Sequence, residues 1–185
     1  MEYKPLAQAH LSRLAEIKAD YVSDKYLRVI KTGDGLEVGF ALRIEHLEEP
    51  FRSQGYGIIR EKDKAEIRSR MDAQALQLVV EHNGRLIGFL DAEIESWRNV
   101  LKIWDVLVDE EHRRQGIGTE LMRRAQEFAA KNNCRALVVE TQTTNWPALN
   151  FYLKMGFQVC AVDDHFYTNR DLERKEVALF LYREL

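Results

Sequence analysis

Apolar residues near the start of the chain recur every three to four positions. The positions concerned are Leu11, Leu14, Ile17 and Tyr21. This spacing places them on one face of a helix, so we expect an amphipathic helix over about Leu6–Tyr21. The heavily charged stretch Glu61–Asp72 is also expected to be helical, with a weaker apolar pattern.

Two apolar-rich pieces, Tyr26–Ile30 and Leu36–Leu42, follow the first helix. They are separated by Gly33-Asp34-Gly35, whose glycines can adopt the positive φ of a tight turn. This pattern predicts a β-hairpin. Further along, Asn83-Gly84 gives a second and stronger hairpin signal, because this pair suits a two-residue turn.

From residue 75 onward, short apolar runs alternate with turn residues and helical patterns. Strands are expected over Ala75–His82, Arg85–Trp97, Val100–Val108, Ala136–Thr141, Phe157–Val162 and Val177–Tyr182, and helices over Gly116–Asn132 and Pro147–Met155. The alternation changes parity between Ile103 and Val106, which predicts a β-bulge. The buried stripe of the longer helix is expected to contain Ile117, Leu121, Ala125, Phe128 and Ala129. This order of elements predicts one α/β domain with a mixed, largely antiparallel sheet.

The composition agrees with one compact soluble domain. The chain has 185 residues, of which 45% are hydrophobic and 31% charged, and its formal net charge is -3. No apolar run approaches the roughly 18 residues of a membrane helix, and the start lacks a secretory-signal pattern. Cys134 and Cys160 show no framework spacing and fit reduced thiols. We therefore expect a cytoplasmic enzyme or binding domain without membrane or nucleic-acid partners, the latter because a basic excess is missing.

A strand, a short loop and a helix with two early glycines follow one another over residues 106–119. Helix N-termini expose unpaired N–H groups and attract phosphates. Gly116 and Gly118 let the backbone approach a pyrophosphate closely, while Arg113 and Arg114 add donors. The spacing matches neither the P-loop nor the Rossmann motif. An ordinary glycine-rich helix start is the alternative, but the preceding strand and the arginines favour a phosphate site.

The run Arg113-Arg114-Gln115-Gly116-Ile117-Gly118 resembles the acyl-CoA signature R/Q-x-x-G-x-G/A of the GNAT superfamily of N-acetyltransferases. Upstream, Val106–Val108 resembles the family's bulged strand, and downstream, residues 145–157 resemble its second half-site. The resemblance implies the GNAT fold, a central mixed and mostly antiparallel sheet flanked by helices and splayed between its two central strands. It also implies acetyl-CoA as co-substrate. The implied cofactor-binding residues are Val106, Leu107, Val108, Arg113, Arg114, Gln115, Gly116, Ile117, Gly118, Thr119, Asn145 and Tyr152.

A narrower resemblance links most of the chain to streptothricin acetyltransferases. The residues that carry it are Leu47-Glu48-Glu49-Pro50-Phe51, Glu140-Thr141-Gln142, Asn145, Ala148, Phe151-Tyr152, Gly156-Phe157 and Glu176-Val177-Ala178-Leu179. Two positions depart from the pattern: Arg114 stands where glycine is usual, and Trp104 stands where an acid tends to precede Asp105. We expect a single domain over residues 1–185, with about 1–72 on the substrate side and about 75–185 as the acetyl-CoA-binding core.

Direct transfer of an acetyl group from acetyl-CoA to a primary amine needs a neutral amine, a polarised carbonyl and a stabilised thiolate. A primary amine has a pKa near ~10.4, so a base is needed at pH 7. Asp105, beside the implied pantetheine strand, and Glu140, at the end of the neighbouring strand, are the candidate bases. Each acid could instead be an ordinary solvated side chain. The resemblance implies that the backbone N–H of Leu107 polarises the carbonyl.

Tyr152 is the candidate for stabilising the leaving thiolate. Its hydroxyl is a donor at neutral pH, and it lies one helical turn after Ala148 on the same face. Full proton transfer from a phenol of pKa near ~10 to a thiolate near ~8.5 is uphill by about 2 kcal/mol, so a hydrogen bond is the expected contribution. A packed core tyrosine is the alternative. Asn145 can cap its helix, bind the pantetheine amides, or do both.

Acids near the implied acceptor side indicate the substrate class. Asp105, Glu140 and Asp163-Asp164 would favour a small cationic amine such as a streptothricin-type antibiotic. A protein or peptide N-acetyltransferase and a non-catalytic acyl-CoA-binding sensor stay open as alternatives, as does a homodimer. The histidines and cysteines lack metal-type spacing, so no metal is expected. The small net charge would then be the sum of two separate groups of charges, arginines at the phosphate loop and acids at the amine cleft.

Overall fold

The computed structural model describes residues 1–55, 59–71 and 74–185, which form two compact units. Unit 1 comprises Met1–Asp20, Gln54–Val139 and Arg183–Leu185, and unit 2 comprises Tyr21–Ser53 and Glu140–Tyr182. The predicted single domain, with a substrate-side part over about 1–72 and an acetyl-CoA-binding core over about 75–185, stays a prediction.

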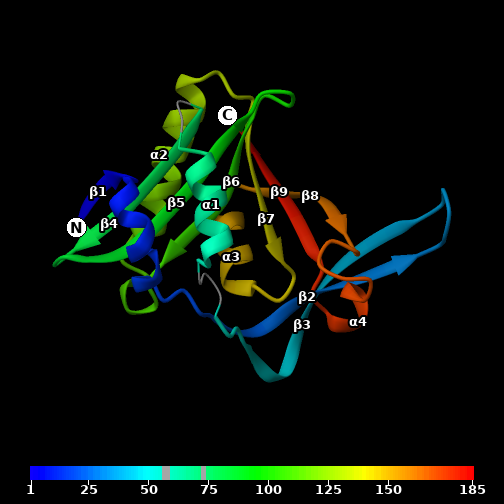
Figure 1. Cartoon of the computed structure of the whole chain (residues 1–185). Helices are drawn as coiled ribbons and strands as arrows, with labels where there is room; N and C mark the ends of the chain where they lie inside the picture. Colours follow the sequence, from blue (N-terminus) through cyan, green and yellow to red (C-terminus); the bar gives the residue numbers. More distant parts are fainter. Residues whose placement is uncertain (56–58, 72–73) are drawn as a thin grey trace. The chain divides into compact units, whose positions relative to one another are not determined.

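Unit 1 is built on one sheet (Figure 1). Its strands, in spatial order, are β1 (Glu2–Pro5), β4 (Ala75–His82), β5 (Arg85–Glu95), β6 (Val100–Val108) and the first part of β7 (Ala136–Gln142). Neighbouring strands are antiparallel except β6 and β7, which pair in parallel from Val100 opposite Ala136 to Ile103 opposite Val139. The mixed, mostly antiparallel sheet is thereby confirmed, while the splay beyond Ile103 stays a prediction.

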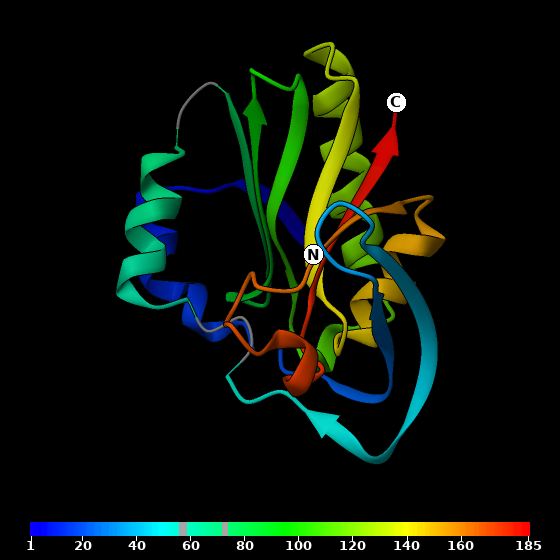
Figure 2. The ribbon, with the colours of Figure 1, turned by 90° about the vertical axis from the view of Figure 1, so that its right-hand side faces the viewer.

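Helices cover both faces of this sheet. They are η1 (Gln8–Glu16), α1 (Glu61–Ser69), η2 (Glu110–His112) and α2 (Ile117–Lys131). The teal α1 and the yellow-green α2 lie on opposite faces of the green strands (Figure 2). On the α1 face, Val79, Phe89 and Leu107 are register partners on three neighbouring strands, and we call them the apolar row. They share a buried cluster with Leu14 of η1 and Ile67 of α1.

The strands and helices predicted after residue 75 are confirmed, with ends that differ by at most two residues. Asn83 and Gly84 have φ values of +49° and +77°, as a tight hairpin turn requires. The predicted bulge is also confirmed, because Asp91 lies opposite Asp105 but Ala92 lies opposite Ile103, which leaves Trp104 as the extra residue. In the stripe of α2, Phe128 is partly buried, and Met122 is buried in addition to the other predicted residues.

The amphipathic α-helix predicted over Leu6–Tyr21 is wrong in type and length. The segment forms the 3₁₀ helix η1, which ends at Glu16. Leu11, Leu14 and Ile17 are buried as expected. Their spacing of three matches the three residues per turn of a 3₁₀ helix better than the 3.6 of an α-helix. Strand β1 was not expected, because four residues carry too little periodic signal.

The other elements of unit 2 are a long hairpin and a smaller group of strands and helices. They are β2 (Val22–Thr32), β3 (Gly39–Arg52), α3 (Trp146–Lys154), β8 (Gln158–Asp163), α4 (Asp171–Arg174) and most of β9 (Ala178–Glu184). β2 pairs antiparallel with β3, and β8 with β9. The predicted hairpin is confirmed at Gly33 and Gly35, with φ values of +71° and +54°. A Cβ on Gly33 would lie 2.0 Å from the Glu37 carbonyl oxygen, so this turn requires glycine.

The charged helix is confirmed as α1, which ends at Ser69, and Asp72 lies outside the described residues. The four-residue helix α4 was not expected from the sequence. Among the helices described, none is long and apolar enough to cross a membrane.

Candidate active site

The loop between β6 and α2 is anchored by the buried carboxylate of Asp109. It accepts hydrogen bonds from the backbone N–H groups of Lys18 (3.1 Å) and Glu111 (3.3 Å), and it pairs with the Arg85 guanidinium (2.7 Å). Burial alone would raise the pKa of Asp109, but the hydrogen bond with His112, the N–H donors and the Arg85 charge lower it overall. The charged carboxylate is therefore part of the loop structure.

Asp109, Glu111 and His112 also form the kind of cluster that can hold a metal ion, since their potential ligand atoms lie within 4.8 Å of one another. The oxygens of Asp109 are, however, already engaged by backbone donors and by Arg85. These residues stabilise the loop through their hydrogen bonds, and we assign no metal to them.

The backbone turns sharply from this loop into α2. Arg114 and the N-cap residue Gly116 have φ values of +63° and +83°, in the left-handed region that favours glycine. Among the residues that the structure describes, no side chain caps the helix, so the N–H groups of its first turn keep their capacity to donate. A Cβ on Gly116 would meet no atom within 4 Å, which leaves space beside these donors. Arg114 is exposed and Arg113 partly buried, so the loop geometry fits an anion.

A polar row crosses the sheet of unit 1 next to the bulge. Gln77, Asp91 and Asp105 are register partners on β4, β5 and β6. Each lies two positions along its strand from a member of the apolar row, so the polar row is on the same face, toward α1. Burial raises the pKa of Asp105 to about 6, and the charge of Asp91 adds to the shift. The candidate base Asp105 therefore lies in a strongly perturbing environment.

Glu140 is held within unit 2 by a hydrogen bond from the hydroxyl of Tyr167. The loop that carries Tyr167 is fixed by the buried carboxylate of Asp171, which accepts from the N–H groups of Tyr167 (2.9 Å) and Thr168 (2.7 Å). Burial alone would raise the pKa of Asp171, but the hydrogen bonds from Thr168 and Tyr167 lower it overall. This second candidate acid is positioned by a tyrosine on an ordered loop.

Asn145 and Tyr152 are both buried in unit 2. The Asn145 side chain accepts from the N–H of Ala148 at 3.2 Å, so it caps α3. The ring of Tyr152 packs between aromatic neighbours, with centroid distances of 5.4 Å to Phe151 and 5.6 Å to Phe157. Packing thus fixes the ring, while the roles of both residues toward a ligand stay predictions.

Two polar side chains at the end of β7 were missed as candidate site residues. Thr141 Oγ1 and Gln142 Oε1 are buried and have no hydrogen-bond partner in the described part of the chain. Buried polar atoms nearly always have a hydrogen-bond partner, so these two oxygens are candidates for hydrogen bonds with a bound ligand. In the sequence, both residues follow the apolar strand and Glu140 directly, and both belong to the segment Glu140-Thr141-Gln142 that carries the narrower resemblance.

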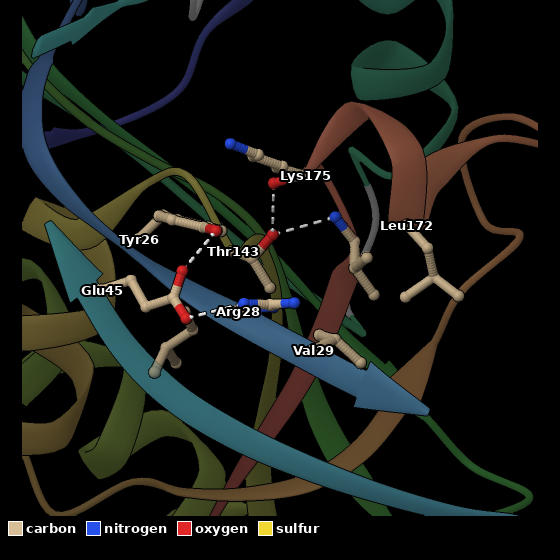
Figure 3. Close-up of a pocket in the computed structure, with 9 residues that line it drawn as sticks. Tyr26, Arg28, Val29, Glu45, Thr143, Leu172 and Lys175 are labelled. Atoms are coloured by element: carbon tan, nitrogen blue, oxygen red, sulfur yellow. Dashed lines mark hydrogen bonds and ion pairs between the residues drawn. The ribbon is translucent and has the colours of Figure 1, made fainter. Parts of the chain in front are cut away.

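Unit 2 also contains a pocket of about 370 Å³ between β2, β3 and the segment after α4 (Figure 3). Tyr26 and Arg28 both donate to Glu45, at 2.8 and 3.1 Å, and the Lys175 ammonium lies 5.5 Å from the ring centroid of Tyr26. The hydroxyl of buried Thr143 donates to the Lys175 carbonyl and accepts from the Val177 N–H, two of the hydrogen bonds drawn in Figure 3. One carboxylate against two cations does not favour a cationic acceptor, so we place no acceptor group here.

The predicted site residues fall in both units. Asp105, Val106, Leu107, Val108, Arg113, Arg114, Gln115, Gly116, Ile117, Gly118 and Thr119 belong to unit 1, and Glu140, Asn145 and Tyr152 belong to unit 2. The bulge lies at Trp104, three residues before Leu107, which pairs in register with Phe89. The role of the Leu107 N–H toward a carbonyl stays a prediction.

Comparison with known proteins gives consistent matches along the chain. Residues 41–157 match the acetyltransferase (GNAT) family. The chain is 29% identical over 171 residues to the streptothricin acetyltransferase of Streptomyces lavendulae, a match that covers 90% of this chain and 86% of that protein.

Two solved structures are similar over nearly their whole length. A nourseothricin acetyltransferase has a TM-score of 0.82 and 27% identity, over 99% of this chain and 97% of that one. A Bacillus anthracis str. Ames protein solved in complex with acetyl coenzyme A has a TM-score of 0.79 and 21% identity, over 100% and 99% of the two chains, and shows the same fold.

The family match spans more than half of the chain and includes both the glycine loop and Tyr152. It also covers the bulged strand β6 that leads into this loop. The chain therefore belongs to the GNAT family of acetyltransferases.

Proposed function

We propose that this enzyme moves the acetyl group of acetyl-CoA to a primary amine of a small cationic molecule of the streptothricin type. The observation that carries the proposal is the match to a streptothricin acetyltransferase over 90% of the chain. A match confined to the glycine loop would concern the cofactor alone, whereas this one extends well beyond the 43–52% of the chain that several other N-acetyltransferases match. It therefore supports a shared acceptor class.

Two features of the chain fit acetyl-CoA as co-substrate. The uncapped N-terminus of α2, with Arg113 and Arg114 beside it, offers donors and positive charge to phosphates. The unpaired oxygens of Thr141 and Gln142 can form hydrogen bonds with amide groups of a ligand. When bound, acetyl-CoA supplies an acetyl group activated as a thioester.

The residues then have distinct roles in the proposed reaction. As the nitrogen–carbon bond forms and the carbon–sulfur bond breaks, a proton passes from the amine to the carboxylate of Asp105. The hydroxyl of Tyr152 donates to the departing thiolate, and the N–H of Leu107 donates to the carbonyl oxygen. Glu140 attracts the cationic acceptor.

The proposal is tested by incubating the enzyme with acetyl-CoA and a panel of amines and measuring free thiol release. We expect streptothricin to be acetylated far faster than lysine-containing peptides. Faster turnover of peptides would favour a peptide N-acetyltransferase instead. Binding of acetyl-CoA without thiol release for any amine would favour a sensor.

The role of Tyr152 is tested by Tyr152→Phe, with Phe151→Leu as a control for aromatic packing. The hydroxyl is lost but the ring remains, so acetyl-CoA affinity should be retained while kcat falls about tenfold or more. An unchanged kcat would remove the tyrosine from the mechanism.

A further inference from the structure

Asp91 is a buried charge in the middle of the sheet of unit 1, with an exposed fraction of 0%. Its register partners are Gln77 on one side and Asp105 on the other. Side chains of register partners on antiparallel strands lie close together on one face. A fully buried carboxylate is thus placed directly beside the candidate base.

Both oxygens of Asp91 are engaged by fixed donors. The Arg70 guanidinium, which follows α1, contacts Oδ2 through Nη2 (2.5 Å) and Nε (3.0 Å). The amide of Gln77 donates to Oδ1 (2.9 Å) and also to the Ile67 carbonyl at the end of α1 (2.8 Å). Because a buried carboxylate is costly unless paired, these donors supply the partners that the burial of Asp91 requires.

Arg70 has a second contact, on the bulge itself. Its guanidinium carbon lies 4.7 Å from the ring centroid of Trp104, the extra residue of the bulge. Lys102 covers the same ring at 3.5 Å, and the indole N–H donates to Glu93 at 3.3 Å. Arg70 therefore contacts both Asp91 and the residue that directly precedes Asp105.

Asp105 itself has no hydrogen-bond or ion-pair partner within residues 1–55, 59–71 and 74–185. The charged groups that act on it are Asp91 from β5 and Arg70, Asp63 and Glu66 from α1 and its C-terminal end. Burial raises the pKa of Asp105 most, the three acids add to the rise, and Arg70 opposes it. An unpaired carboxylate among these groups is suited to gaining and losing a proton.

We infer that Arg70 and Asp91 are positioning residues for Asp105: Arg70 holds the Asp91 carboxylate beside that of Asp105 and also packs on Trp104 of the bulge, so that Asp105 can take a proton from the acceptor amine. The inference rests on the proposed function, in which Asp105 is the base. A carboxylate is a more effective general base when its pKa is close to the pH at which the enzyme works. The like charge of Asp91 favours the protonated form of Asp105, and Arg70 fixes the position of the Asp91 carboxylate.

The charge coupling is measured directly on the whole protein without ligands. The carboxyl carbon of Asp105 is followed by carbon-13 NMR as the pH varies, and its signal is assigned by its loss in Asp105→Asn. We expect a midpoint of about 6 in the natural protein. Asp91→Asn should lower this midpoint by about one pH unit, because a neighbouring like charge is removed.

Glu66→Gln is the matched control, since it makes the same chemical change at an exposed position of α1. Solvent screening should limit its effect to less than about 0.3 pH unit. A midpoint that stays near 6 in Asp91→Asn, or that moves equally in Glu66→Gln, overturns the inference.

The pH dependence of kcat/KM separates this inference from the proposed function. An acid limb that moves with the carboxyl midpoint in Asp91→Asn supports the positioning role. A midpoint that moves while the acid limb does not would overturn the positioning role, and continued thiol release with streptothricin would leave acetyl transfer standing.

Arg70→Lys tests the second contact without removing the positive charge. The planar fork and its stacking on Trp104 are lost, so kcat should fall about five- to tenfold while the KM for acetyl-CoA stays unchanged. An unchanged circular dichroism spectrum shows that the variant is folded. A kcat equal to that of the natural protein would overturn the role of Arg70 at the bulge.

Discussion

The two candidate acids of this enzyme have contrasting surroundings. Asp105 in unit 1 is partly buried, lies opposite Asp91 and has a pKa raised to about 6. Glu140 in unit 2 accepts a hydrogen bond from Tyr167, on a loop that Asp171 holds in place. Within the described residues, Asp105 has no hydrogen-bond or ion-pair partner, whereas Glu140 is engaged by a hydroxyl.

This difference indicates different tasks for two residues that are equal as sequence candidates. A carboxylate whose proton affinity is raised by burial and by a like charge suits proton transfer. A carboxylate already engaged by a neutral donor suits the attraction of a cation. We therefore assign proton transfer to Asp105 and acceptor binding to Glu140 as our proposal.

The largest expected effect is that of Asp105→Asn on catalysis. The amide has the same shape but cannot take a proton, so kcat/KM for the acceptor should fall about 100-fold or more. The binding of acetyl-CoA, measured by calorimetry, should be unchanged. A loss of less than tenfold would contradict the contrast between the two acids.

The same substitution should raise the stability of the folded protein at neutral pH. The folded state of the natural protein holds its Asp105 proton more tightly than the unfolded chain, so the contribution of this group to stability falls as the pH rises from about 4 to about 6. At pH 7, Asp105→Asn should therefore increase the free energy of unfolding by about 3 kcal/mol. Urea denaturation at pH 4 and pH 7 checks this, and an equal effect at both pH values would argue against the perturbed carboxyl.

A smaller effect is expected for Glu140→Gln. Loss of its charge should raise the KM for a cationic acceptor by about three- to tenfold, with little change in kcat, because attraction is weakened while proton transfer is retained. Steady-state kinetics at low and high salt measure it. Tyr167→Phe is the control, since it removes the hydroxyl and leaves the charge. A kcat loss for Glu140→Gln as large as that for Asp105→Asn would reverse the assignment.

The smallest effect is expected at a position that leaves both acids intact. Arg114 has a φ of +63°, a backbone conformation that is unfavourable for residues with a Cβ. Glycine adopts it without this cost in free energy. Arg114→Gly should stabilise the folded protein without ligands by about 0.5 kcal/mol, since the greater flexibility of glycine in the unfolded chain offsets part of the gain. Chemical denaturation would show it, and a destabilised variant would mean that the arginine side chain has a structural role.

Much of the fold follows from local signals in the sequence. The turns at Gly33-Asp34-Gly35 and Asn83-Gly84 were predicted because each needs residues that accept positive φ, and the bulge at Trp104 followed from a change in alternation. The first helix was misjudged because a spacing of three satisfies both helix types over a few residues.

The environment of Asp105 could not be predicted in the same way. Its neighbours Asp91 and Arg70 come from a different strand and from the end of α1, so only strand register and helix packing bring them together. The sequence did contain one sign of it, a charged residue at Asp91 inside an apolar strand. A buried acid at such a position implies a partner without identifying it.

The most direct test of this account is the rate of thiol release from acetyl-CoA with streptothricin and with lysine-containing peptides, for the natural enzyme, Asp105→Asn and Glu140→Gln. We predict fast turnover of streptothricin over peptides by the natural enzyme, a large loss of kcat in Asp105→Asn, and an effect confined to KM in Glu140→Gln. Preference for peptides, or full activity of Asp105→Asn on streptothricin, would contradict it.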